Sequence, residues 1–167
     1  MSLRVAILTI SDRSSRGERL DSSGPALEAV VHSQGWSVSF VKIIPDDFAV
    51  IQHTLTQWCE GGDTDVILTT GGTGFGPRDV TPEATQAILE RPAPGIAEAM
   101  RLAGLRVTPH AMLSRAVCGI RGRTLIINLP GSPKGAVESL QVVLPVLPHA
   151  VEMLQGDPGA EAGHSRL

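Results

Sequence analysis

A glycine-rich segment that begins at Thr70 carries the residue types best suited to binding a charged ligand. It has the sequence Thr70-Gly71-Gly72-Thr73-Gly74 and directly follows a short apolar run. Glycines after a buried strand permit positive φ angles and a close approach of the backbone to a ligand. Successive backbone N–H groups, with the hydroxyls of the two threonines, can then surround an anion such as a phosphate. A tight turn without a ligand is the alternative that composition leaves open.

The spacing of these glycines differs from that of two common phosphate-binding loops. No Gly-Lys-Ser/Thr follows, as a P-loop requires, and Gly76-Pro77 does not lead into a helix, as the dinucleotide-binding fingerprint requires. The sequence has no nucleophile elbow and no protein-kinase motif. The five histidines lack the spacing of metal ligands, and we interpret them as surface residues or residues with internal partners.

Two aspartates near this segment have the chemistry of magnesium ligands. Asp79 follows Arg78 just before a predicted helix. An arginine there suits a phosphate, and an aspartate can hold Mg²⁺ whose other ligands include phosphate oxygens. Asp46 follows a predicted strand together with Asp47. The alternatives are that Asp79 only favours the helix dipole and that the Asp46-Asp47 pair caps a helix beginning near Phe48.

Two further loops join predicted strands to predicted helices. The segment from Asn128 to Gly135 offers backbone amides, the Ser132 hydroxyl and Lys134, whose ammonium could meet a phosphate as a point charge. A plain loop with an exposed lysine is the alternative. The segment from Ser11 to Gly24 is long and polar for such a connection, and long loops often carry function. Spacing does not show which of its residues touch a ligand.

The elements that must position these residues follow from the pattern of apolar residues. Strands are predicted at residues 3–10, 36–44, 65–70, 116–120 and 124–128, and helices from Ser23 to Gly35, from Phe48 to Gly61, from Thr81, from Pro94 and from Lys134. Thr81 is predicted to cap its helix, with Pro82 in the first turn. In the last helix, Pro145 and Pro148 should introduce a kink or a break.

Strands that alternate with helices predict a three-layer α/β/α sandwich with a mostly parallel central sheet. Ligands of such sheets bind at the carboxyl ends of the strands. The loops after residues 10, 44, 70 and 128 therefore form the expected site. Residues 1–155 are predicted to be one domain, and residues 156–167 a flexible tail rich in glycine, alanine and polar residues.

Composition and charge exclude several classes of function. The chain of 167 residues has a net charge of −3 and 3% aromatic residues, so it lacks the basic stripe and the stacking platforms of a nucleic-acid binder. Its two cysteines, Cys59 and Cys118, lie far apart and predict neither a disulfide framework nor a zinc site. No signal-peptide pattern and no stretch long enough to span a membrane is recognised, so a cytoplasmic protein is expected.

In this order, the motifs resemble those of the molybdopterin-binding MoaB/Mog family from about Arg4 to Leu154. The matching segments are Ser11-Asp12, Arg16-Gly17-Glu18, Asp21-x-Ser23-Gly24-Pro25, Ile44-Pro45-Asp46-Asp47, Thr70 to Gly74 with Arg78 to Glu83, Pro94-Gly95, Leu113-Ser114-Arg115-Ala116 and Asn128 to Pro133. Each glycine motif alone is moderately specific, and their order along the chain is highly specific.

The resemblance implies an enzyme of molybdenum cofactor biosynthesis that converts molybdopterin and MgATP into adenylyl-molybdopterin and pyrophosphate. It implies that Asp46 and Asp79 are catalytic and hold Mg²⁺. It also implies a substrate- and nucleotide-binding set of Ser11, Asp12, Thr70, Gly71, Gly72, Thr73, Gly74, Ser114, Asn128, Pro130, Gly131, Ser132 and Lys134. A homotrimer or a hexamer is expected, with molybdopterin synthase acting upstream and a molybdate-insertion enzyme downstream.

Other functions within this resemblance stay open. A pterin carrier without efficient adenylyl transfer would have the same motifs. The molybdate-insertion enzyme carries a related domain but needs additional domains, and a scaffold module would be expected within a larger protein.

Overall fold

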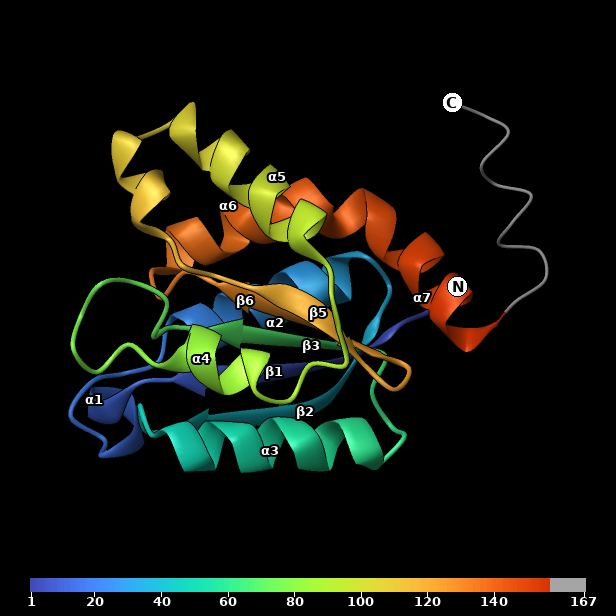
Figure 1. Cartoon of the computed structure of the whole chain (residues 1–167), viewed down its shortest axis with the longest axis horizontal. Helices are drawn as coiled ribbons and strands as arrows, with labels where there is room; N and C mark the ends of the chain where they lie inside the picture. The colour runs from blue at the N-terminus through green and yellow to red at the C-terminus, as the bar shows by residue number, and fades with distance from the viewer. Residues whose placement is uncertain (157–167) are drawn as a thin grey trace.

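A six-stranded sheet forms the centre of the computed structural model, which describes residues 1–156 (Figure 1). Its strands are β1 (Arg4–Ile10), β2 (Ser37–Ile44), β3 (Val66–Thr70), β4 (Arg91–Pro92), β5 (Cys118–Arg121) and β6 (Thr124–Leu129), in the order β2-β1-β3-β6-β5-β4. Strands β2, β1, β3 and β6 run parallel, whereas β5 and β4 join antiparallel. The prediction of a mostly parallel sheet is confirmed, and the short strand β4 was not predicted.

Helices cover both faces of the sheet, as the predicted three-layer fold requires (Figure 1). One layer consists of α2 (Ser23–Ser33), α5 (Pro94–Leu105), α6 (Pro133–Val143) and α7 (Leu147–Gln155), and the other of α3 (Phe48–Glu60) and α4 (Thr81–Gln86). Side chains of β1 alternate between the two layers: Val5 and Ile7 pack in the first, and Ala6 and Leu8 in the second. This alternation explains why the strand is apolar on both faces.

The start of α4 was predicted correctly, but the predicted role of Thr81 was wrong. The residue in the N-cap position is Val80, and it makes no side-chain capping bond. The Thr81 hydroxyl is fully buried and donates a hydrogen bond of 2.9 Å to the Gly71 carbonyl oxygen. Because that carbonyl belongs to the glycine segment, Thr81 fixes the start of α4 against the segment.

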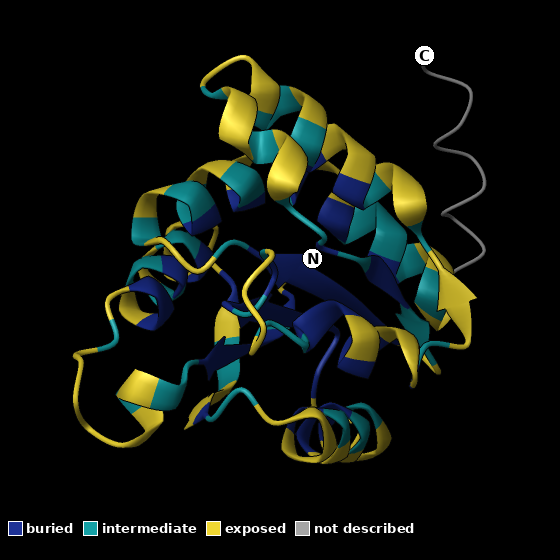
Figure 2. Ribbon diagram, turned by 60° about the vertical axis from the view of Figure 1, so that its left-hand side comes forward, coloured by how far each residue is buried: buried dark blue, intermediate teal, exposed yellow. Residues whose placement is uncertain are grey.

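The C-terminal helical run is broken where the two prolines predicted it. A 3₁₀ turn, η2 (Leu144–Val146), separates α6 from α7. By length and composition alone, Pro133–Gln155 could cross a membrane, which corrects the expectation that no stretch is long enough. One stripe of this run, however, packs into the core of the protein, and Figure 2 shows the buried patches along it. The stripe comprises Ala136, Leu140, Val143, Leu147 and Val151. Apart from Gly156, the predicted flexible tail lies outside the described residues.

Candidate active site

The loops that follow β1, β2, β3 and β6 come together at one end of the sheet (Figure 1). Hydrogen bonds link loops that are far apart in the sequence. The Thr70 hydroxyl donates to the Pro130 carbonyl at 2.7 Å, and the Ser23 hydroxyl donates to the Gly131 carbonyl at 2.7 Å. The backbone N–H of Ser11 donates to the Ile44 carbonyl at 2.9 Å. The expected site is therefore one connected structure.

Gly71 and Gly72 are required by close packing within this structure. Gly71 has a φ of +105°, and a Cβ atom added there would lie 2.2 Å from the Ile10 carbonyl oxygen. Gly72 has a φ of +65°, and its added Cβ would lie 2.3 Å from Thr81 Oγ1 and 3.0 Å from Asp46 Oδ1. Residues other than glycine rarely adopt these φ values. At these two positions a side chain would also collide with neighbouring loops. The glycines thus let the β3 loop reach the β1 loop and the Asp46 carboxylate.

Asp12 and Asp46 hold each other by two reciprocal hydrogen bonds. The Asp12 N–H donates to Asp46 Oδ2 at 2.8 Å, and the Asp46 N–H donates to Asp12 Oδ1 at 3.1 Å. Asp12 begins a short helix, α1 (Asp12–Ser15), whose N-cap is Ser11; its Oγ accepts from the Ser14 N–H at 3.2 Å. This helical turn was predicted only as a loop. Two of the candidate residues, Ser11 and Asp12, therefore build the backbone turn beside Asp46.

The two carboxyl groups differ in their charge environment. Arg78 binds both oxygens of Asp12, with distances of 3.0 and 3.1 Å, and this hydrogen bonding lowers the pKa of Asp12. Burial raises the pKa of Asp46 above its ordinary value, and the negative charges of Asp12 and Asp79 act in the same direction. A cation next to Asp46 and Asp79 would relieve this repulsion.

Asp79 is held by its own loop. Its Oδ2 accepts a hydrogen bond of 2.9 Å from the Gly76 N–H, and its N–H donates to the Gly76 carbonyl at 3.0 Å. Arg115, which the sequence indicated only as part of a motif, contacts the same loop through its guanidinium group. No spacing rule could have found this contact, because Arg115 is 36 residues from Asp79 in the chain.

Two cavities meet at the glycine segment. The larger one, of about 860 Å³, extends between α5, α6 and the 3₁₀ helix η1 (Pro109–Leu113); the smaller one, of about 330 Å³, lies over the ends of β1 and β3. Four residues border both cavities: Gly72, Asp79, Gly131 and Ser132. Asp46 borders the smaller cavity only. Asp79 is thus the carboxylate placed where two bound molecules could meet.

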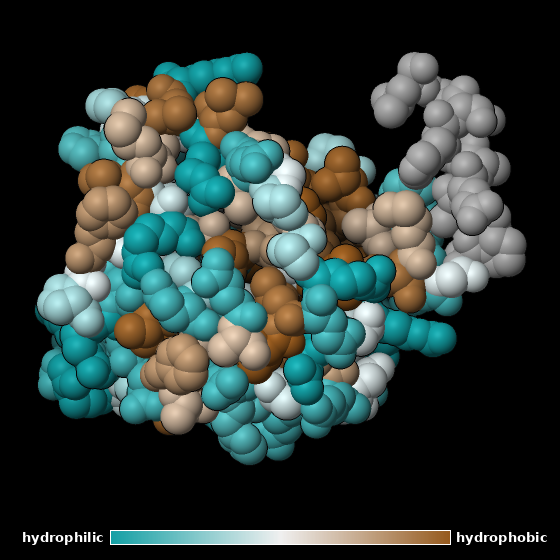
Figure 3. All heavy atoms as spheres, in the orientation of Figure 1, coloured by the Kyte–Doolittle hydropathy of each residue, from teal (hydrophilic) through white to brown (hydrophobic). Residues whose placement is uncertain are grey.

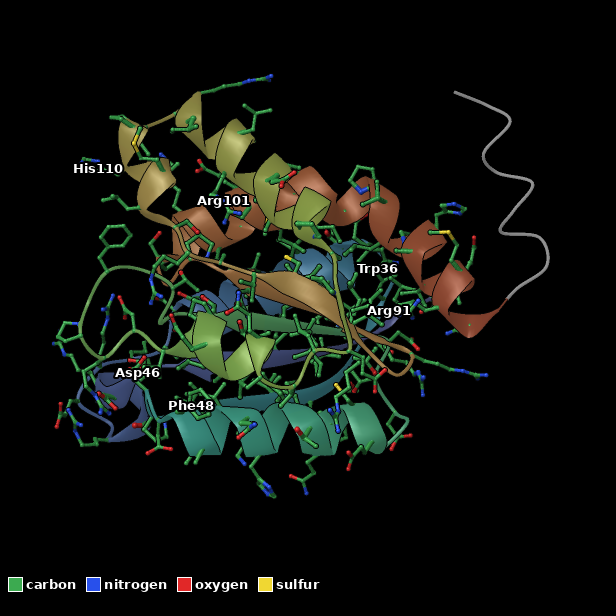
Figure 4. All side chains as sticks on the ribbon, in the orientation of Figure 1. Trp36, Asp46, Phe48, Arg91, Arg101 and His110 are labelled. Carbon is green, nitrogen blue, oxygen red and sulfur yellow. The ribbon has the colours of Figure 1, made fainter. Side chains whose placement is uncertain are left out.

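The walls of the two cavities differ in chemistry. Ser11, Asp21 and Asp46 give the smaller cavity a polar wall. The larger one includes Arg101, which projects from α5 and donates a hydrogen bond of 2.8 Å to the Ala116 carbonyl (Figure 4). Exposed apolar side chains gather over α5 and η1 beside this cavity (Figure 3). They are Leu102, Leu105, Val107, Met112 and Leu113. Of these, Val107 and Leu113 line the cavity, together with the apolar side chains of Ala97, Met100 and Val142. The larger cavity therefore suits a molecule with an extended apolar or ring surface.

One predicted ligand-binding residue, Asn128, has several structural partners. Asn128 is fully buried; its Nδ2 donates to Thr69 Oγ1 and Thr85 Oγ1 at 2.9 and 3.0 Å, and its Oδ1 accepts from the Val117 N–H at 3.2 Å. The Asn128 side chain therefore links β6 to β3, to α4 and to the chain just before β5. The residue also borders the larger cavity. Direct ligand contact by this side chain stays a prediction.

Other predicted binding residues differ in how they reach the cavities. The Lys134 side chain is 80% exposed, lies 3.9 Å from Glu138, and borders neither cavity. Its contact with a phosphate stays a prediction. Ser132 caps α6 by accepting from the Gly135 N–H at 3.1 Å, and Ser114 accepts from the Ala116 N–H at 3.3 Å. Both serines nevertheless border the larger cavity, as do Thr73, Gly74 and Pro130.

This fold and site define a class: open, mostly parallel α/β proteins that bind small ligands where the strands end. The chain belongs to the family described as the probable molybdopterin binding domain, whose family model matches residues 6–149. It is 54% identical to the molybdopterin biosynthesis enzyme MoaB from Thermus thermophilus, with a TM-score of 0.88 over 93% of this chain and 98% of that one.

Curated relatives include proteins of similar length and much longer ones. The chain is 38% identical to a molybdopterin adenylyltransferase from Helicobacter pylori, over 93% of this chain and 90% of that protein. It is 48% identical to gephyrin from Dictyostelium discoideum, over 92% of this chain but only 23% of gephyrin. The chain thus spans about a quarter of the longer relative.

Proposed function

We propose that the protein is a molybdopterin adenylyltransferase of molybdenum cofactor biosynthesis, which transfers AMP from ATP to the terminal phosphate of molybdopterin. The observation that carries this proposal is the pair of cavities that share Asp79, Gly72, Gly131 and Ser132. A reaction between two bound molecules needs their reacting groups to meet at one place. Similarity to the adenylyltransferase of H. pylori over nearly the whole chain supports the same activity.

The reaction joins two anions. An oxygen of the molybdopterin phosphate forms a bond to the α-phosphorus of ATP, and the bond from that phosphorus to the oxygen bridging to the β-phosphorus breaks. Pyrophosphate leaves with the electron pair of the broken bond. Backbone amides of Gly72, Thr73 and Gly74 orient the phosphates, so no side-chain nucleophile is needed. Positioning and electrostatic stabilisation are the main sources of catalysis in such transfers.

The donor set fits Mg²⁺. Asp46 Oδ1 and Asp79 Oδ1 accept no hydrogen bond from any described residue, whereas both oxygens of Asp12 are bound by Arg78. Within residues 1–156, no three of the His, Cys, Asp and Glu side chains form a ready-made metal site. Mg²⁺ commonly uses one or two carboxylates together with substrate phosphates and water. When bound, Mg²⁺ would neutralise the charge that develops on the pyrophosphate.

The test is release of pyrophosphate from ATP in the presence of Mg²⁺ and molybdopterin. Asp79→Asn should lower kcat about 100-fold or more, because the metal-binding oxygen loses its charge. Molybdopterin binding should be retained. Asp47→Asn is the matched control: Asp47 caps α3 by accepting from the Val50 N–H at 3.0 Å, and asparagine caps as well as aspartate. Full activity of Asp79→Asn would refute the metal role.

The same assay separates an enzyme from a carrier. A pterin-binding protein without efficient transfer would bind molybdopterin and release no pyrophosphate above background. In the proposed function the protein is cytoplasmic, acts as a homotrimer or hexamer, and works between molybdopterin synthase and a molybdate-insertion enzyme. Analytical ultracentrifugation of the full chain tests the oligomeric state, and a monomer at micromolar concentration would contradict it.

A further inference from the structure

Arg115 connects the glycine segment with the start of α4, although it belongs to neither. Arg115 precedes β5, and its backbone N–H donates to the Thr73 carbonyl at 2.8 Å. Its Nε donates to the Gly74 carbonyl and its Nη2 to the Asp79 carbonyl, both at 2.7 Å. Its Nη1 pairs with the Glu83 carboxylate on α4. A single side chain therefore holds both ends of the loop at residues 74–79.

This loop has little else to fix it. Residues 75–78 are exposed and lie outside any helix or strand, and the loop contact between Asp79 and Gly76 is local. Among the described residues, the other hydrogen bonds from the loop to more distant parts of the chain are those of the exposed Arg78 with Asp12. Beyond the loop, Thr81 ties the start of α4 to the Gly71 and Gly72 carbonyls. Within the loop, the carbonyls of Gly74 and Asp79 are held by Arg115.

Arg115 acts from behind the loop and does not face a substrate. It borders neither cavity in the described part of the chain. The planar guanidinium group can bind two carbonyls and a carboxylate at once, which the point charge of a lysine cannot reproduce.

We propose that Arg115 is a positioning residue for the transfer reaction: it sets the backbone of Gly74 and Asp79, and through them the metal-binding carboxylate. The inference rests on the proposed function, because Arg115 is proposed to position Asp79, the residue that holds Mg²⁺ in that function. A variant without the guanidinium group still has the Asp79 carboxylate, but that carboxylate is held less firmly.

The experiment compares Arg115→Met with Arg121→Met. Arg121 is a matched control on β5, since it also joins a backbone carbonyl, that of Ile88 at 3.1 Å, to a carboxylate, that of Glu60 at 2.8 Å. We expect Arg115→Met to lower kcat about 10- to 100-fold and to raise the half-saturating Mg²⁺ concentration by a similar factor. The KM for molybdopterin should change by less than about threefold, and Arg121→Met should match the wild type in all three.

Hydrogen exchange provides a readout without metal or substrate. In the metal-free protein, the hydrogen-bonded backbone amides of Gly76 and Asp79 should exchange at least about tenfold faster in Arg115→Met than in Arg121→Met. Arg115→Lys should lie between Arg115→Met and the wild type. If Arg115→Met does not fold, Glu83→Gln is the second variant, because it loosens the guanidinium group without removing it and should raise the Mg²⁺ requirement more modestly.

The outcomes separate this inference from the proposed function. An Arg115→Met protein with the kcat, Mg²⁺ requirement and exchange rates of Arg121→Met overturns the positioning role, as does an activity loss that only follows the unfolded fraction. If Asp79→Asn is inactive and Arg115→Met is normal, only the inference fails. If Asp79→Asn is fully active, the metal role in the proposed function fails independently of Arg115.

Discussion

Two neighbouring carboxyl groups of the site, Asp12 and Asp46, have pKa values shifted in opposite directions. Asp12 is stabilised as an anion by Arg78, while burial disfavours the charge of neighbouring Asp46. Folding therefore places a carboxylate where its charge is costly. A residue held at such a cost is typical of functional sites, where stability is lower than the fold alone would allow.

Asp46→Asn should stabilise the protein at neutral pH and impair the proposed transfer. The pKa of Asp46 is raised in the folded state above the ordinary value of 3.8. Its contribution to stability is present below that value and is lost as the pH rises through the folded-state pKa. The melting temperature of the variant minus that of the wild type should therefore increase as the pH rises from about 3 to about 7. A constant difference across this range would contradict the burial of the charge.

Asn128→Ala should destabilise the fold by about 2–4 kcal/mol, because two threonine hydroxyls and the Val117 N–H lose a buried partner. Urea denaturation measures this loss. If the variant keeps wild-type stability but no longer binds molybdopterin or ATP, the sequence-based prediction of direct ligand contact by Asn128 is correct and the structural role is wrong.

At the scale of elements, the loop between β3 and α4 depends on how closely it approaches β1. Gly71→Ala should cost at least about 3 kcal/mol, since strain at positive φ adds to a collision with the Ile10 carbonyl. Gly35→Ala is the control: Gly35 also has a positive φ, of +72°, but open space around its Cβ position, so about 1 kcal/mol is expected. Equal losses in denaturation experiments would show that backbone strain alone determines both.

The elements themselves were largely predictable from local sequence. The apolar run of β1, the Asp47 cap and the prolines of the C-terminal run all act through neighbouring residues, and these predictions hold. The role of Thr81 and the contacts of Arg115 were not predictable, because their partners lie ten or more residues away. The two-residue strand β4 has no periodicity that a sequence pattern can reveal.

Across the whole molecule, two apolar layers on opposite faces of one sheet share the strands β1, β3 and β6. We expect one cooperative unfolding transition for the predicted single domain. Leu140→Ala in the first layer and Leu55→Ala in the second should each cost about 2–5 kcal/mol. Both variants should shift the far-UV circular dichroism and tryptophan fluorescence curves together. Curves that separate in either variant would indicate that the two layers unfold independently.

The hydrogen bonds among the site loops also limit how this protein can be re-engineered or can diverge. Thr70 is joined to Pro130, Ser23 to Gly131, and Asp12 to Asp46, so each loop is built against a specific partner. A chimera that takes one loop from a relative would combine surfaces that never evolved together. We expect such loops to be exchangeable only as a set, and substitutions within them to be tolerated in matched pairs rather than singly.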